Sequence, residues 1–111
     1  MDSLEKLFLF QRTKKCTLLG VGPMSKNCVD TTIEVANRFD VPLMIIASRR
    51  QIECKELGGG YVNNWSTEDF ADYVSEKDIK KNIILCRDHG GPFQGKDGKE
   101  IEIEKSMENA K

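Results

Sequence analysis

The sequence predicts an α/β protein in which consecutive strand–helix units build a parallel sheet. Three short apolar segments of strand type recur along the 111 residues, and each ends in a polar or glycine-rich turn. Segments in which apolar residues recur at helical spacing follow the first two of them. No hairpin signal joins two alternating segments, so the strands are expected to be parallel.

The composition is that of one globular domain without a strong electrostatic field. Apolar residues make up 39% of the chain, charged residues 32%, and the formal net charge is -1. The lysines and arginines are dispersed, which argues against a nucleic-acid partner. No apolar run approaches the roughly 20 residues of a membrane span, and the start lacks the features of a signal peptide.

The cysteines indicate a reducing compartment. Cys16, Cys28, Cys54 and Cys86 form no Cys-x-x-Cys pair, so a zinc knuckle is not expected. Cys16 and Cys86 lie in or beside apolar runs, where we expect them to pack as small hydrophobic side chains. We therefore expect reduced thiols and a cytoplasmic protein.

The first strand–helix unit follows a short amphipathic helix or arm. Residues 17–25 predict a buried strand that runs into a Gly/Pro turn. Residues 27–39 predict a helix, with Ser25 or Asn27 as its N-cap. The buried stripe of this helix is expected to contain Val29, Ile33, Ala36 and Val35.

The second and third units repeat the pattern. Residues 41–48 form a continuous apolar run, as expected of a strand that is covered on both faces. A loop with three consecutive glycines precedes a helix over residues 68–74, capped by Ser66 or Thr67. The third strand is expected over residues 82–86, and a last helix from near residue 101 to residue 111.

The predicted organisation is an N-terminal helix or arm over residues 1–15 and a βαβαβα segment over residues 16–111. Three units do not close a barrel of eight, which needs about 250 residues. We interpret the chain as the first three units of such a barrel, either a partial barrel or a truncated chain; a small open sheet is the alternative. A truncated chain would expose apolar faces and would self-associate.

Polar residues gather where the strands end, and in parallel βα architectures these ends line the active site. Asp88 and His89, the only histidine, follow the third strand. An imidazole is a common ligand of a divalent metal, and a neighbouring carboxylate can transfer protons. In the alternative, His89 only hydrogen-bonds its loop, and Asp88 pairs with Arg87 or Arg49.

Two further segments could hold an anion such as a sugar phosphate. Arg49 and Arg50 could grip phosphate or carboxylate, although loop arginines are usually solvated. The backbone N–H groups of residues 58–61 could approach an anion, or the glycines could form a flexible connection. No Gly-Lys-Ser/Thr follows them, so the segment is no P-loop. Trp65 and Tyr61 are expected to pack this loop.

Four motifs together carry a family resemblance. They are Ala47-Ser48 with Gln51, Gly59-Gly60-Tyr61, Ser66/Thr67-x-x-Phe70-x-x-Tyr73-Val74, and Asn82-Ile83-Ile84-Leu85 leading to Asp88-His89-x-Gly91-Pro92. In combination they resemble the non-catalytic subunit family of class II tagatose-bisphosphate aldolase. The resemblance covers residues 16–111, which match only the first part of such a chain.

The resemblance implies a TIM barrel related to the zinc-dependent class II aldolases, with Asp88 as acid/base and His89 as metal ligand. It implies a sugar-phosphate substrate of the tagatose or fructose bisphosphate type. The candidate substrate contacts are Ser48, Arg49, Gln51, Gly59 and Gly60. Two functions stay open: an aldolase-like enzyme, or a non-enzymatic subunit that stabilises a catalytic aldolase partner. We expect no catalysis from this chain alone.

Overall fold

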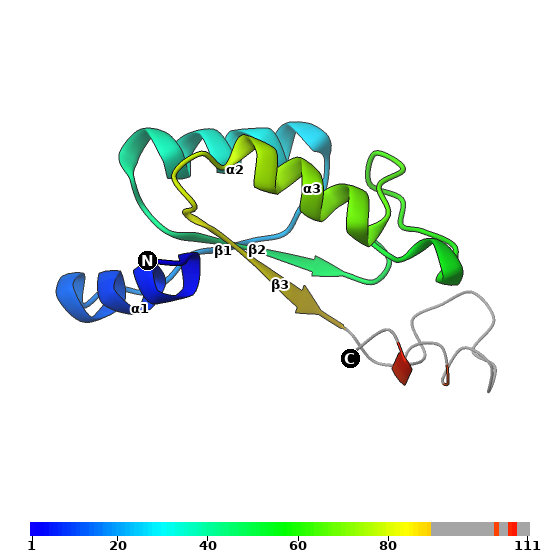
Figure 1. Ribbon diagram of the computed structural model, residues 1–111, viewed down its shortest axis with the longest axis horizontal. Helices are drawn as coiled ribbons and strands as arrows, with labels where there is room; N and C mark the ends of the chain where they lie inside the picture. The colour runs from blue at the N-terminus through cyan, green and yellow to red at the C-terminus, as the bar shows by residue number, and fades with distance from the viewer. Residues whose placement is uncertain (90–103, 105–106, 109–111) are drawn as a thin grey trace.

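The computed structural model describes residues 1–89, 104 and 107–108, and it contains a three-stranded parallel sheet with helices packed around it (Figure 1). The elements, in chain order, are α1 (Ser3–Lys14), β1 (Gly20–Val21), α2 (Lys26–Phe39), β2 (Leu43–Ser48), the 3-10 turn η1 (Lys55–Leu57), α3 (Thr67–Lys77) and β3 (Ile83–Asp88). The predicted α/β class with a parallel sheet is confirmed. The predicted last helix lies largely outside the described residues; 104, 107 and 108 are helical.

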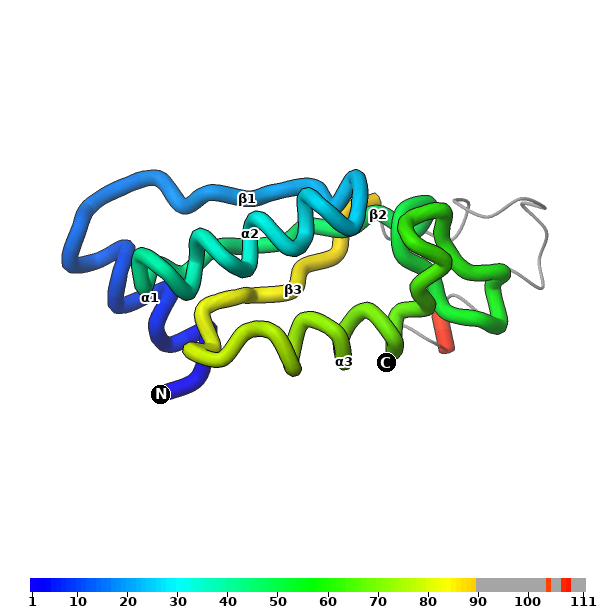
Figure 2. The backbone as a smooth tube through the Cα atoms, turned by 90° about the horizontal axis from the view of Figure 1, so that it is seen from above, coloured from blue at the N-terminus to red at the C-terminus, as the bar shows by residue number. Residues whose placement is uncertain are grey.

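The strands lie in the order β1-β2-β3, and every pairing is parallel. Helices α2 and α3 lie over the same face of the sheet (Figures 1 and 2). Helix α1 lies at the amino end of the strands, on the other side of the sheet. All three strands therefore point their carboxyl ends toward the same edge, away from α1.

The core lies between the sheet and the helices α2 and α3. Along β2 the buried residues Leu43, Ile45 and Ala47 alternate with half-buried ones, because successive side chains of a strand point to opposite faces. The buried residues join Val29 of α2 and Phe70 of α3 in one hydrophobic cluster. The expectation that β2 is covered on both faces is therefore wrong: its second face is only half covered.

Strand β1 is much shorter than the sequence suggested. Only Gly20 and Val21 pair with β2, opposite Met44 and Ile45, and Leu19 is exposed. The prediction of a buried strand over residues 17–25 is wrong because β1 pairs on one side only, with β2. Gly20 packs closely against Ile46, since a Cβ built on it would lie 2.4 Å from Cδ1 of Ile46, whose side chain would have to move.

The helices begin at the residues that can cap them. Ser25 accepts a hydrogen bond from the N–H of Cys28 at the start of α2. Ser66 and Asp69 form a reciprocal capping box at the start of α3. Val35 is exposed, so it does not belong to the predicted buried stripe of α2.

The start of β3 is held by a buried aspartate. The carboxylate of Asp78 accepts hydrogen bonds from the N–H groups of Asn82 (2.9 Å) and Ile83 (2.8 Å) and from the side-chain amide of Asn37 (3.0 Å). Asp78 is 3% exposed, so its charge depends on these donors. This network ties β3 to α2 and fixes the register in which Ile83 lies opposite Leu43.

Several single-residue expectations differ from the structure. Cys16 is exposed rather than packed, and Tyr61 is exposed whereas Trp65 is buried in the core. All four cysteines are free thiols. No helix among the described residues has the length and apolar character needed to cross a membrane.

Candidate functional site

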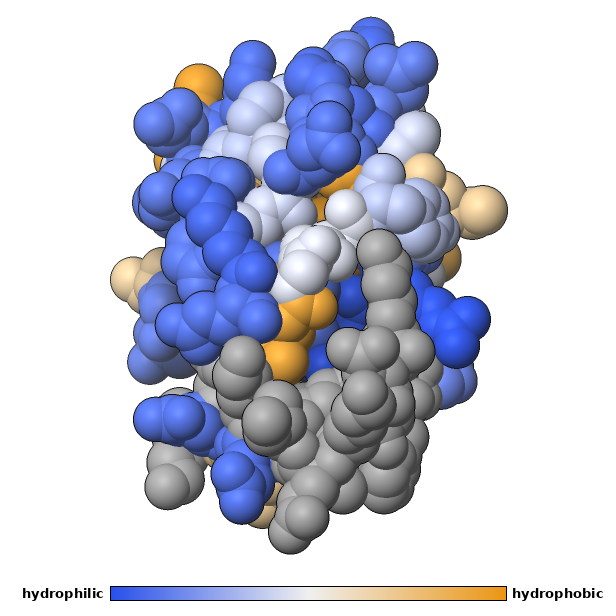
Figure 3. All heavy atoms as spheres, turned by 90° about the vertical axis from the view of Figure 1, so that its right-hand side faces the viewer, coloured by the Kyte–Doolittle hydropathy of each residue, from blue (hydrophilic) through white to orange (hydrophobic). Residues whose placement is uncertain are grey.

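The carboxyl edge of the sheet brings the predicted polar residues together. Because β2 and β3 are parallel and in register, Ser48 at the end of β2 lies opposite Asp88 at the end of β3. Strand β3 extends to Asp88, two residues beyond its predicted end, since pairing with β2 continues that far. The described atoms at this end of the molecule are mostly hydrophilic and surround a small hydrophobic spot (Figure 3).

Asp88 and His89 form a pair in which both carboxylate oxygens contact the histidine. Oδ2 of Asp88 lies 2.9 Å from Nδ1 of His89, and Oδ1 accepts a hydrogen bond of 2.9 Å from the His89 N–H. The side chains are 54% and 69% exposed, respectively. A carboxylate at Nδ1 favours the tautomer that carries its proton there, which leaves Nε2 with a lone pair toward solvent.

This pairing corrects one part of the alternative interpretation. Asp88 contacts His89 and not Arg87 or Arg49, whereas the other part of that alternative, in which His89 hydrogen-bonds its own loop, agrees with the geometry. His89 has a positive φ of 46°, a backbone conformation that few non-glycine residues adopt. The turn therefore holds the imidazole beside its own neighbour rather than against a distant partner.

The pair fits one ligand position of a metal site and not a complete site. Metal-ligating histidines commonly donate their other ring N–H to a carboxylate, and Asp88 is placed to accept it. A zinc ion needs at least three protein ligands. Among the described residues, no group of three or more His, Cys, Asp or Glu side chains lies close enough to hold a metal ion.

Ser48 and Gln51 are joined at the end of β2. The Ser48 N–H donates to Oε1 of Gln51 (3.0 Å), and the Gln51 N–H donates to the Ser48 carbonyl (3.1 Å). The amide nitrogen of Gln51 reaches toward β1, since a Cβ built on Gly22 would lie 3.9 Å from it. Gln51 is therefore joined to Ser48 and lies near the turn that follows β1.

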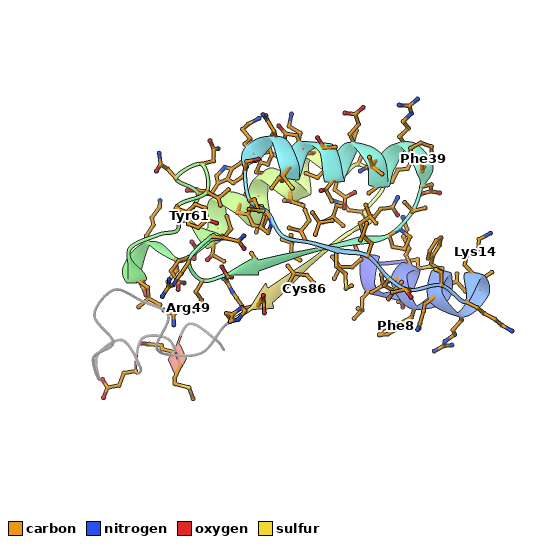
Figure 4. All side chains as sticks on the ribbon, turned by 180° about the vertical axis from the view of Figure 1, so that it is seen from behind. Phe8, Lys14, Phe39, Arg49, Tyr61 and Cys86 are labelled. Atoms are coloured by element: carbon orange, nitrogen blue, oxygen red, sulfur yellow. The ribbon has the colours of Figure 1, made fainter. Side chains whose placement is uncertain are left out.

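Arg49 is one of the two arginines that could grip phosphate or carboxylate, and the structure does not leave it in solvent. It is buried, and its guanidinium Nε forms an ion pair with the equally buried Glu53 one helical turn later. In Figure 4 it lies at the end of the sheet toward which β2 points. Arg50 is exposed and has no ion pair within the described part of the chain, so it is the arginine available to an anion.

The glycine loop is fastened by its own backbone. The N–H groups of Gly58, Gly59 and Tyr61 donate to the carbonyls of Lys55, Cys54 and Arg50. These donors are not free for an anion, so the loop geometry does not favour an anion cradle. Gly60 packs against β2's turn, because a Cβ built on it would lie 2.0 Å from the Gln51 carbonyl oxygen.

Arg87 is a residue whose role the sequence did not indicate. Its guanidinium donates to the carbonyls of Ile52 (2.6 Å) and Ala47 (3.4 Å), so it clamps the loop that follows β2. The sequence signal that could have indicated this role is the alternation of side chains along a strand. Arg87 and Asp88 must point to opposite faces of the sheet, so the arginine cannot serve Asp88.

The fold and the site define a small α/β protein with a histidine–carboxylate pair at the carboxyl edge of a parallel sheet. Comparison with known proteins gives no match to a family model, to a curated protein or to a solved structure. The function is therefore argued from the sequence motifs and from the geometry of this site.

Proposed function

We propose that this chain is a class II aldolase-like protein of sugar-phosphate metabolism that contributes one wall of an active site. The observation that carries the proposal is the Asp88–His89 pair at the carboxyl edge of a parallel sheet, with Ser48 directly opposite Asp88. Ligands of parallel βα proteins bind at this edge.

The arrangement of the elements supports the first three units of a barrel. The strand order follows the chain order, and α2 and α3 lie on the same face of the sheet (Figure 1). A singly wound sheet of this kind is how a TIM barrel begins, whereas a doubly wound sheet places its helices on both faces. Leu85 of β3 lies opposite the core residue Ile45 and is exposed, as expected of a strand face that a further helix of a barrel would cover.

The proposed chemistry assigns roles by geometry. His89 would hold a divalent metal such as zinc through Nε2, and the metal when bound would polarise a ketose carbonyl. Both carboxylate oxygens of Asp88 contact His89, so we assign Asp88 the role of orienting the imidazole. To act as the acid/base that the resemblance implies, Asp88 would have to break these contacts. Arg50 is the exposed cation for a phosphate group.

The second candidate is a non-enzymatic subunit that stabilises a catalytic aldolase partner. One observation favours it: the described residues offer a single imidazole and no three-residue metal cluster. A chain with an incomplete site and an exposed edge strand would act by packing against a partner. The same features are consistent with self-association of the chain.

Metal binding by the chain tests the site. We expect Zn²⁺, followed by calorimetry, to bind weakly at pH 7.5 and to lose binding in His89→Ala. Asp88→Asn should weaken binding about tenfold or more, since the carboxylate orients the ligand. The matched control is Asp72→Asn, on the exposed side of α3, which should bind like the parent. Equal affinity of all four proteins would refute the metal role of His89.

Addition of a catalytic class II aldolase subunit separates the two functions. If the chain is an enzyme, retro-aldol cleavage of tagatose or fructose bisphosphate should depend on His89 of this chain. If the chain is a non-enzymatic subunit, the parent and the His89→Ala variant should raise the partner's cleavage rate or thermal stability equally. Both functions would be refuted if cleavage in the mixture does not depend on His89 and the chain changes neither the partner's cleavage rate nor its thermal stability.

A further inference from the structure

A cavity of about 270 Å³ lies at the opposite end of the molecule from Asp88 and His89. Helix α1 forms one wall, and the residues just before β2 and β3 form the other. Figure 4 places Lys14 of α1 at this end and Arg49 at the far end of the sheet. The cavity is thus separate from the candidate site and takes no part in the proposed function.

The cavity has an apolar lining of a definite size. Leu9, Phe10 and Pro42 supply apolar surface from α1 and from the turn before β2. It is open to solvent on one side, and its volume corresponds to roughly nine waters at about 30 Å³ each, so an extended chain of about eight carbon atoms can lie against the lining. Apolar surface of this kind favours a ligand with a hydrocarbon body.

Two of the hydrogen-bond acceptors around the cavity already have donors. Oδ1 of Asn82 accepts from the ammonium of Lys6 (3.4 Å), and Oδ1 of Asp40 accepts from the Asn82 amide (2.8 Å). The other hydrogen of that amide is bound by the Ala36 carbonyl (3.1 Å). The hydrogen bond from Asn82 holds the pKa of Asp40 below its usual range, so Asp40 stays ionised.

The donors, in contrast, are not all used. Lys6 donates to the Lys80 carbonyl and to Asn82, which leaves one hydrogen of its ammonium. Lys14 has neither a hydrogen bond nor an ion pair among the described residues. The charged side chains in the lining, two lysines and Asp40, sum to +1. A ligand that accepts hydrogen bonds and carries negative charge complements this set.

We propose that this cavity binds a small amphipathic anion, a medium-chain carboxylate of about eight carbons, with its chain on Leu9, Phe10 and Pro42 and its head group at Lys14. The hydrocarbon chain supplies the affinity, and the ammonium selects an anion over a neutral molecule of the same shape. Asp40 opposes binding, because its carboxylate lines the same cavity and carries the charge of the ligand's head group.

Titration of the 111-residue chain with sodium octanoate, followed by amide NMR, tests the proposal. We expect saturable binding with shifts concentrated on residues 9–14 and 40–42, and weaker binding of 1-octanol. Lys14→Gln should weaken octanoate binding about three- to fivefold, the size of an exposed charge pair. Arg12→Gln removes the same charge from the last turn of α1, outside the cavity, and should leave the affinity unchanged.

Asp40→Asn provides a test of opposite sign. Asparagine keeps an acceptor for Asn82 and tolerates the left-handed backbone of this residue, φ 51°, so the variant should fold. We expect it to bind octanoate about three- to fivefold more tightly, since a negative charge has left the lining. Equal weakening by Lys14→Gln and Arg12→Gln, no gain in Asp40→Asn, or shifts spread over the whole chain would each overturn the proposal.

Discussion

Replacement of Asp78 by alanine should unfold the chain more readily than any surface change. The carboxylate of Asp78 is buried and accepts three hydrogen bonds, two of them from the backbone at the start of β3. Alanine leaves these three donors without an acceptor, at a cost of about 1 kcal/mol each, so we expect a loss of about 3 kcal/mol. That is a large fraction of the stability of an ordinary domain.

Urea denaturation gives the measurement, with two probes. Far-ultraviolet circular dichroism reports the helices. Fluorescence of Trp65 reports the core, because its ring packs against Tyr73 with centroids 4.8 Å apart. Asp78→Asn keeps one acceptor oxygen and should lie between the parent and Asp78→Ala. Asp72→Ala, at an exposed position of α3, is the control and should change stability by less than about 0.5 kcal/mol.

The same variant also connects the core to the candidate site. Asp78 holds the backbone of Asn82 and Ile83, and that register carries Asp88 to its position opposite Ser48. A slip of one residue would turn Asp88 to the other face of the sheet. If Asp78→Ala costs less than about 1 kcal/mol, or no more than Asp72→Ala, the network does not fix β3 and the reasoning fails.

Three further predictions follow from single contacts. Gly60→Ala should destabilise the chain by about 1–3 kcal/mol in urea denaturation, because the new Cβ would overlap backbone atoms of residues 51 and 52. Gly22→Ala is the matched control, since its Cβ would make only an ordinary van der Waals contact. Equal loss of stability in both variants would argue against a steric cause. Maleimide should label the exposed Cys16 first and Cys54 last, since Cys54 is buried and burial raises the pKa of its thiol. Early labelling of Cys54 would contradict the predicted order. The hydrogen bond from Ser66 lowers the pKa of Asp69 below its ordinary 3.8. The ionised carboxylate therefore stabilises the fold above pH 3.8, and this stabilisation is lost as the pH falls through the lowered pKa. Acid denaturation of Asp69→Asn should lack this loss of stability.

Much of the fold could be predicted because its signals are local. The caps Ser25 and Ser66 lie next to the helices that they begin, and the apolar spacing of α2 marks the face that it buries. The extent of the strands could not be predicted in this way. Whether a segment is a strand depends on the neighbour with which it pairs. The predicted length of β1 was therefore too great and that of β3 too small.

The candidate site divides along the same line. Ser48, Gln51, Asp88 and His89 could be chosen from their places at strand ends, and the structure brings Ser48 together with both Gln51 and Asp88. Arg49 could not be judged in advance, because its burial depends on the loop that folds over it. A charged side chain is buried only when a partner such as Glu53 lies within reach.

The sequence by itself determined the order of helices and strands, the helix starts and the polar character of the strand ends. These follow from side-chain spacing, capping chemistry and turn residues, which act over a few positions of the chain. Only the tertiary structure decided that Asp88 pairs with His89, that Arg49 is buried, and that α1 forms one wall of an open pocket at the far end. The pocket depends on contacts between segments far apart in sequence, and the two ion pairs depend on how the backbone turns at the strand ends and on the direction in which each side chain leaves it.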